Sequence, residues 1–172
     1  MAINQFNLAD GQRAERKLLI TVAEWKEGEQ DVREILGKRT EDSSIEYNPD
    51  IQTSTDILGH NYTDINKTQP QQDFDPYLIL GGSKLGAKLN DIRKRNALSE
   101  LSQFTLYVIT AFVGSKGAYE AEKHEGCTIT YNSMGGDANV NFPISAYFSN
   151  VITNGTVDKL SDDFVFTPDV TV

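Results

Sequence analysis

The sequence predicts a mainly β protein in which two packed antiparallel sheets, arranged as a sandwich or barrel, are flanked by one α-helix. Apolar residues recur with the strand period of two in most of the chain. Only residues 83–95 have the spacing of an amphipathic helix, and from residue 103 onward every apolar segment is strand-like. The 172 residues fit a single domain, 1–172, that is large enough to bury its own core.

The N-terminal third begins with a predicted arm and a predicted hairpin. Residues 1–15 are polar with few apolar anchors, so we expect a flexible N-terminal arm. Residues 17–25 alternate apolar side chains on two faces and predict a strand. A turn at Gly28 leads to a second strand at 32–38, which makes 17–38 a hairpin.

Residues 44–69 predict a long hairpin with one polar face. Isoleucine, tyrosine and threonine occupy the odd positions of 44–57 and polar residues the even ones, with an interruption at Pro49. Residues 58–61 predict the turn and 62–69 the returning strand. A hairpin this polar on one side cannot be buried in its own domain. It therefore lies on a surface or joins a sheet supplied by other subunits.

The second half of the chain contains the helix and the remaining strands. Leu85, Leu89 and Ile92 share one helical face in 83–95, and Ser83 is a suitable N-cap. Residues 103–113 are apolar on both faces, as expected for a central strand covered on both sides. Further strands are predicted at 127–132, 140–148, 151–153 and 164–167, with Asn154-Gly155 as a hairpin turn.

Charge is distributed unevenly in this acidic chain, whose formal net charge is −9. Residues 40–76 contain eight acidic residues and one lysine, whereas 83–95 contain five basic residues and one aspartate. Tight wrapping of DNA requires basic side chains, so an acidic chain is not expected to bind DNA tightly. The two regions are either ordinary solvated faces or complementary faces that meet in neighbouring copies.

The sequence contains no recognisable catalytic or metal-binding motif, so we expect no enzyme activity, no cofactor and no metal. The loop 81–88 resembles a phosphate-binding loop, but Ala87 and Lys88 stand where that motif needs lysine and a hydroxyl residue. His124 and Cys127 are too few ligands for a structural zinc site. We expect Cys127 to begin a strand as a buried small residue and His60 to be exposed in a turn. Carboxylate pairs that meet only in the fold remain possible.

Cysteine usage and hydropathy bear on the cellular compartment. Cys127 is the only cysteine, which excludes an internal disulfide and fits folding in a reducing compartment. The first residues lack the pattern of a signal peptide. The longest strongly apolar run, 106–113, is too short to span a bilayer, so no membrane insertion is expected.

Five segments together resemble the major tail tube proteins of long-tailed bacteriophages, especially those of Gram-positive hosts. They are SIEYNPDIQTSTDILG (44–59), DFDPYLILGG (73–82), LYVITAFVG (106–114), the YEAEKHEGCTI region with its GGD turn (119–137), and GTVDKLSDDFVFTP (155–168). The resemblance implies two packed sheets flanked by a helix, and hexameric rings stacked into a tube through which the genome passes. It also implies tape measure, tail terminator and distal tail proteins as partners, with synthesis in the host cytoplasm and final location in the virion tail.

The resemblance gives the charged residues expected positions in such a tube. Glu46, Asp50 and Asp56 are then candidates to line the lumen, where carboxylates would repel passing DNA. Candidates for inter-ring or inter-subunit contacts are Lys84, Lys88, Arg93 and Arg95. The alternatives are another self-assembling virion protein, such as a tail terminator or capsid decoration protein, a bacterial secretion-tube subunit, a monomeric ligand-binding β-barrel, or an enzyme.

Overall fold

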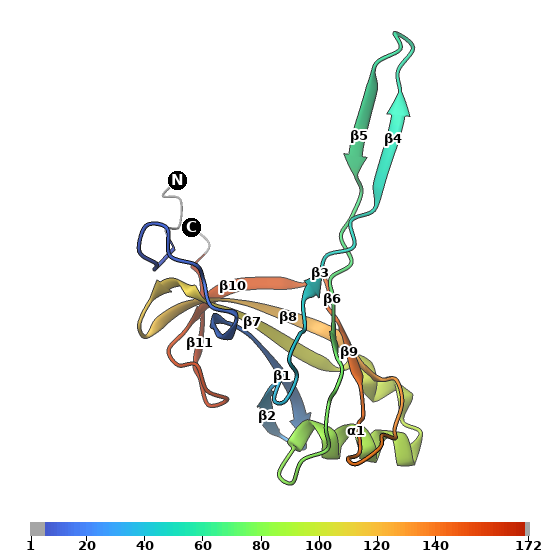
Figure 1. Cartoon of the computed structure of the whole chain (residues 1–172), viewed down its shortest axis with the longest axis vertical. Helices are drawn as coiled ribbons and strands as arrows, with labels where there is room; N and C mark the ends of the chain where they lie inside the picture. The colour runs from blue at the N-terminus through green and yellow to red at the C-terminus, as the bar shows by residue number, and fades with distance from the viewer. Residues whose placement is uncertain (1–5, 171–172) are drawn as a thin grey trace.

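The computed structural model describes residues 6–170 and confirms a mainly β fold with two sheet layers and one helix (Figure 1). The elements, in chain order, are β1 (Leu19–Glu27), β2 (Gln30–Ile35), β3 (Ile45–Glu46), β4 (Ile51–Thr55), β5 (Asn61–Ile65), β6 (Gln71–Phe74), α1 (Lys84–Arg95), β7 (Phe104–Ser115), β8 (Ala118–Tyr131), β9 (Ile144–Tyr147), β10 (Ile152–Val157) and β11 (Phe166–Pro168). Short 3-10 helices cover Arg16–Leu18 and Leu98–Ser102.

Strand β8 belongs to both sheet layers. On one edge it pairs with β7, which continues to β1 and β2. Its other edge pairs first with β10 and then, beyond Gly126, with β9, which leads to β6 and β3. Gly126 has a left-handed φ of 72°, which a glycine adopts without strain. The second layer folds back over the first, and Thr21 on β1 donates a buried 2.7 Å hydrogen bond to Gln72 on β6.

The main core lies between the two layers and is closed at one end by α1. The helical face predicted from the sequence is correct, because Leu85, Leu89 and Ile92 are fully buried there. Ser83 is the N-cap, and its Oγ accepts a 3.2 Å hydrogen bond from Gly86 N–H. Complete burial of such an aliphatic side chain contributes about 1.5–3 kcal/mol, so this face is what holds the helix on the sheets.

A second, smaller core covers the opposite face of the first layer. Leu106 and Val108 on β7 point into the main core, whereas Tyr107 and Ile109 point into the second core beside Phe164. The ring centroids of Tyr107 and Phe164 lie 5.0 Å apart in an edge-to-face arrangement. The prediction of a central strand covered on both sides is therefore confirmed for β7.

Two predictions about local structure are wrong. Asn154-Gly155 is not a turn but lies inside β10, where a Cβ on Gly155 would come within 2.3 Å of the Thr167 carbonyl oxygen on β11. Glycine is required there by close packing of the next strand rather than by a bend. Cys127 does not begin a strand, because β8 already begins at Ala118.

The N-terminal segment contacts β7 at Phe6 and Asn7. Phe6 forms a bridge with Val113, and Asn7 N–H donates a 2.8 Å hydrogen bond to the carbonyl of Phe112. Residues 1–5 of the predicted flexible arm lie outside the described residues, and its flexibility stays a prediction.

Candidate self-assembly surface

Strands β4 and β5 form a two-stranded hairpin that projects far from the body of the protein (Figure 1). Every residue of both strands is exposed, and they pair with each other in a separate two-stranded sheet. Where the hairpin leaves the body, β3 pairs with β6 in the larger sheet. An isolated two-stranded hairpin is at best marginally stable in water. This exposed hairpin is the feature of the described chain that most needs a partner.

The two faces of the hairpin differ chemically. One face pairs Ile51 with Ile65 and Thr53 with Thr63, whose hydroxyl oxygens lie 3.3 Å apart. The opposite face pairs Gln52 with Asp64 and Ser54 with Tyr62. Cross-strand pairs of β-branched residues favour pairing within a sheet. The hairpin therefore presents a β-branched face and a polar face, as the alternation in the sequence predicts.

The structure places the three lumen candidates in different settings. Asp50 lies beside Asn66, whose Nδ2 donates a 3.4 Å hydrogen bond to its carboxylate. Asp56 instead caps the tip, because its Oδ1 accepts hydrogen bonds from the N–H groups of Leu58 and His60. The backbone hydrogen bond from His60 is the largest cause of a lowered pKa for Asp56. Glu46 belongs to β3, separated from the hairpin by the left-handed backbone of Asn48.

Asp64 was not among the predicted lumen residues, although it lies on the polar face opposite Gln52. The prediction followed the alternation of 44–57 but did not fix the register of the returning strand. That register follows from the tip, where Gly59 has a φ of 81° and Asp56 N–H donates to the His60 carbonyl. Counting outward from this closed turn would have identified Asp64.

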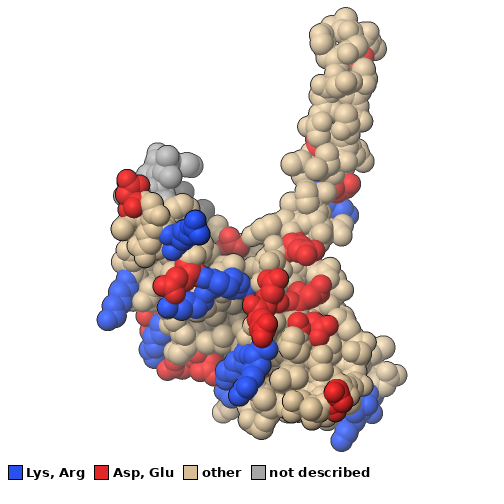
Figure 2. Space-filling model, in the orientation of Figure 1, with Lys and Arg blue, Asp and Glu red and all other residues tan. Residues whose placement is uncertain are grey.

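Acidic side chains gather on the body where the hairpin begins (Figure 2). Asp42, Glu46 and Asp73 line a shallow hollow there. Within residues 6–170, none of these three carboxylates is joined to a lysine or arginine by a salt bridge. The hollow beside the projecting hairpin thus carries three carboxylates that have no ion-pair partner among the described residues.

The basic residues of α1 mostly have partners within the chain. Lys88 and Arg95 both form ion pairs with Glu100, at 3.0 Å and 2.8 Å. These pairs lower the pKa of Glu100 to about 2, chiefly through the hydrogen bond from Arg95. Lys84 contacts Asp162 at 3.3 Å, whereas Arg93 contacts only the side chain of Asn90 among the described residues. Arg93 is therefore the candidate contact residue with the fewest internal charge partners.

The start of α1 is occupied by a carboxylate from β2. Glu34 accepts hydrogen bonds from the backbone N–H groups of Lys84 and Leu85 and from the hydroxyls of Ser83 and Tyr77. A helix N-terminus attracts anions because its first N–H groups lack partners within the helix. Here the protein supplies that anion itself. Residues 81–88 thus form the short loop before a capped helix and its first turn. This agrees with the differences between their sequence and the phosphate-loop motif.

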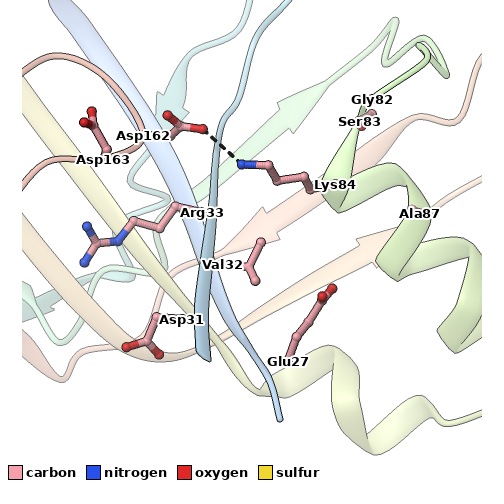
Figure 3. A pocket seen from close by; sticks show the side chains of 10 residues that line it. All are labelled: Glu27, Asp31, Val32, Arg33, Gly82, Ser83, Lys84, Ala87, Asp162 and Asp163. Atoms are coloured by element: carbon pink, nitrogen blue, oxygen red, sulfur yellow. Dashed lines mark hydrogen bonds and ion pairs between the residues drawn. The ribbon is translucent and has the colours of Figure 1, made fainter. Parts of the chain in front are cut away.

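An open cleft of about 940 Å³ lies between β2, the start of α1 and the loop before β11 (Figure 3). Several of its charged side chains are paired within the chain. The Lys84–Asp162 ion pair reaches across it, and Arg33 is bound to Glu24. Asp163 accepts hydrogen bonds from Lys159 and Ser161. Arg33, Lys84, Asp162 and Asp163 of the cleft thus each have a partner within the chain.

The region around His124 and Cys127 lies on β8 and is buried. Cys127 is 1% exposed, and burial raises the pKa of its thiol. His124 is also buried, whereas His60 is exposed at the hairpin tip, as predicted. Among residues 6–170, no three His, Cys, Asp or Glu side chains come together in a way that could hold a metal ion. No helix in the same range is long and apolar enough to cross a membrane.

No protein-family model, curated protein or solved structure matches this chain.

Proposed function

We propose that this chain is a structural subunit that assembles with copies of itself into stacked hexameric rings, forming the tail tube of a long-tailed bacteriophage. The observation that carries the proposal is the projecting β4–β5 hairpin, which is exposed on both faces. In an assembly, its free edges would pair with strands of neighbouring subunits, and unpaired strand edges would no longer face solvent.

The two hairpin faces suit the two sides of a shared barrel wall. The face of Ile51, Thr53, Thr63 and Ile65 would pack against protein, and the face of Gln52 and Asp64 would border a water-filled lumen. In a closed barrel, inward and outward residues alternate along each strand in the same way. Asp50 and Asp64, repeated around each ring, would repel phosphates, so DNA would pass without adhering.

The tape measure, tail terminator and distal tail proteins are the partners proposed at the ends of the tube. In this proposal the chain has no catalytic role and needs no cofactor. Its location is the virion tail, after synthesis in the host cytoplasm.

Removing the hairpin tests the proposal directly. Gln69 N–H donates a 2.8 Å hydrogen bond to the Tyr47 carbonyl, so a two-residue Asn-Gly turn can join these positions in place of 48–68. The shortened chain should remain a folded monomer, because the excised residues contribute nothing to either core. Light scattering and negative-stain microscopy should show tubes only for the full chain. Tubes of normal diameter from the shortened chain would refute the role of the hairpin, and single rings from the full chain would favour a tail terminator.

A further inference from the structure

A groove of about 460 Å³ lies on the body of the protein between the 3-10 helix Arg16–Leu18, the start of β1, the end of β2 and the segment that leads to β3. Part of its lining is apolar. Leu19, Ile20 and Ile35 are only partly buried there, beside the core residue Phe74. Loss of one leucine side chain from a protein core leaves a cavity of roughly 150 Å³. The groove therefore has room for two aliphatic side chains.

Basic residues outnumber acidic ones in the lining of this groove. Arg16, Lys17 and Lys38 line it, and Glu41 is the only acidic residue among the described residues that do so. Lys17 already has a partner, because its Nζ lies 2.6 Å from a carboxylate oxygen of Glu15. Lys38 is exposed and forms no salt bridge within residues 6–170. The groove thus combines apolar surface with a cationic side chain that has no anionic partner in the described chain.

The tip of the β4–β5 hairpin has the complementary character. Ile57 is 102% exposed and Leu58 is 75% exposed, although turns are usually built from small or polar residues. Residues 48–66, which form the hairpin, include three aspartates and no lysine or arginine. The tip projects far from its own body (Figure 1), so it cannot reach the groove of the same chain. A contact between tip and groove therefore requires a second copy.

We propose that the groove receives the hairpin tip of a second copy, with Ile57 and Leu58 against its apolar lining and the acidic hairpin beside Lys38. Tip and groove are different surfaces, so the contact is head-to-tail and can be repeated from one copy to the next. Strand β4 ends at Thr55 and β5 begins at Asn61, so the strands stay available for pairing at their sides. The inference deepens the proposed function and rests on it in one respect, because both require self-association.

Disulfide crosslinking in the full chain tests the contact. In the variant His60→Cys with Glu41→Cys, one cysteine is at the tip and the other lines the groove, and both replaced side chains are exposed. Mild oxidation of the assembled protein should give a ladder of multimers on a non-reducing gel. The natural Cys127, which is 1% exposed, is the common background. The matched control pairs His60→Cys with Met134→Cys, which lies in another exposed apolar region, and each single variant should give dimers at most.

The outcomes separate this inference from the tube proposal, because microscopy of the same samples shows whether tubes form. Tubes without a ladder in the groove variant, or with a ladder only in the Met134→Cys control, would overturn the tip-to-groove contact and leave the tube proposal standing. A ladder from the groove variant in assemblies that are not tubes would support the contact and overturn the tube. Monomers at every concentration would overturn both.

The strength and sign of the interaction give a second test. In Ile57→Ser with Leu58→Ser, the concentration needed for assembly should rise about tenfold or more, because burial of one such side chain changes an affinity by at least that factor. Lys38→Gln should weaken assembly, and this loss should shrink as salt is raised. Glu41→Gln in the same groove is the matched control and should not weaken it. Equal weakening by the two glutamine variants, or an unchanged assembly concentration for the serine variant, would overturn the proposal.

Discussion

Ile51 on β4 lies directly opposite Ile65 on β5, and both side chains are more than half exposed, at 56% and 64%. Replacing both by serine should change the free energy of unfolding of the free subunit by no more than about 0.5 kcal/mol, because neither side chain is buried there. Assembly should nevertheless weaken, because this face would be covered between subunits. Sedimentation velocity over a concentration series measures the effect. The control replaces Gln52 and Asp64, the adjacent pair on the polar face; equal loss of assembly in both variants would contradict the assignment of the faces.

Charge reversal on the polar face should make assembled tubes bind DNA. In the variant Asp50→Lys with Asp64→Lys, the lumen would carry rings of ammonium groups, which bind phosphates and release counterions. Co-sedimentation with short duplex DNA at low salt should detect binding that disappears as salt is raised, with tubes of the original chain as the unbound reference. The matched control is Asp10→Lys with Glu29→Lys, two exposed positions outside the hairpin. Binding by the control tubes but not by the hairpin variant would contradict the lumen assignment.

Glu34 should matter for stability far more than the exposed Glu29 on the same hairpin. Glu34→Ala leaves the N–H groups of Lys84 and Leu85 and the hydroxyl of the buried Tyr77 without this acceptor, which we expect to cost about 1–3 kcal/mol of unfolding free energy. Urea denaturation measures this cost. Glu29→Ala in the exposed turn between β1 and β2 is the matched control and should change stability little. Equal stability of both variants would show that the helix does not depend on this cap.

Alkaline pH should destabilise the protein partly through Tyr107. Burial raises the pKa of Tyr107 to about 12, and its hydroxyl donates hydrogen bonds to the Glu24 carboxylate at 3.3–3.4 Å. The unfolded tyrosine ionises near its ordinary value of about 10. The stability contributed by neutral Tyr107 is therefore complete below about pH 10 and lost as the pH approaches 12. Unfolding midpoints should fall less steeply over this range in Tyr107→Phe, and an unchanged slope would contradict the expectation.

Cys127 should react with thiol reagents only when the fold opens. Burial blocks access and raises the pKa of the thiol, so the reactive thiolate is scarce. Because it is the only cysteine, one absorbance signal from a disulfide reagent reports the opening of this part of β8. The native protein should react orders of magnitude more slowly than the protein in urea. Fast labelling without denaturant would show that β8 opens locally.

The features that the sequence predicted correctly are those with strong local patterns. Leu85, Leu89 and Ile92 define a helical face, and Ser83 is a suitable cap. The predicted helix, 83–95, therefore agrees with α1 at both ends to within one residue. The hairpin was recognisable because polar and β-branched residues alternate up to a glycine-containing turn. Strand β8 was harder to predict, because several of its inward positions hold Ala121, His124 and Cys127 rather than large apolar residues.

The errors came from contacts between residues distant in sequence. Asn154-Gly155 is a common turn sequence, but Gly155 is needed because Thr167 on the next strand approaches it closely. No residue near Gly155 in the sequence indicates this contact. Glu34 lies fifty residues before the helix that it caps, so no spacing rule connects it to Lys84. The buried bond between Thr21 and Gln72 is likewise visible only once the layers are stacked.

The sharing of β8 between both layers has a consequence for how the protein opens. Its first part is bonded to β7 and β10, and its last part to β9. Neither layer can melt while the other stays intact without breaking this one continuous strand. We therefore expect slow and nearly uniform amide hydrogen exchange along β7 and β8, limited by global unfolding, beside rapid exchange in β4 and β5 of the free subunit. The protein would then consist of one cooperatively unfolding body and a hairpin whose amide hydrogens exchange almost as fast as those of a free peptide.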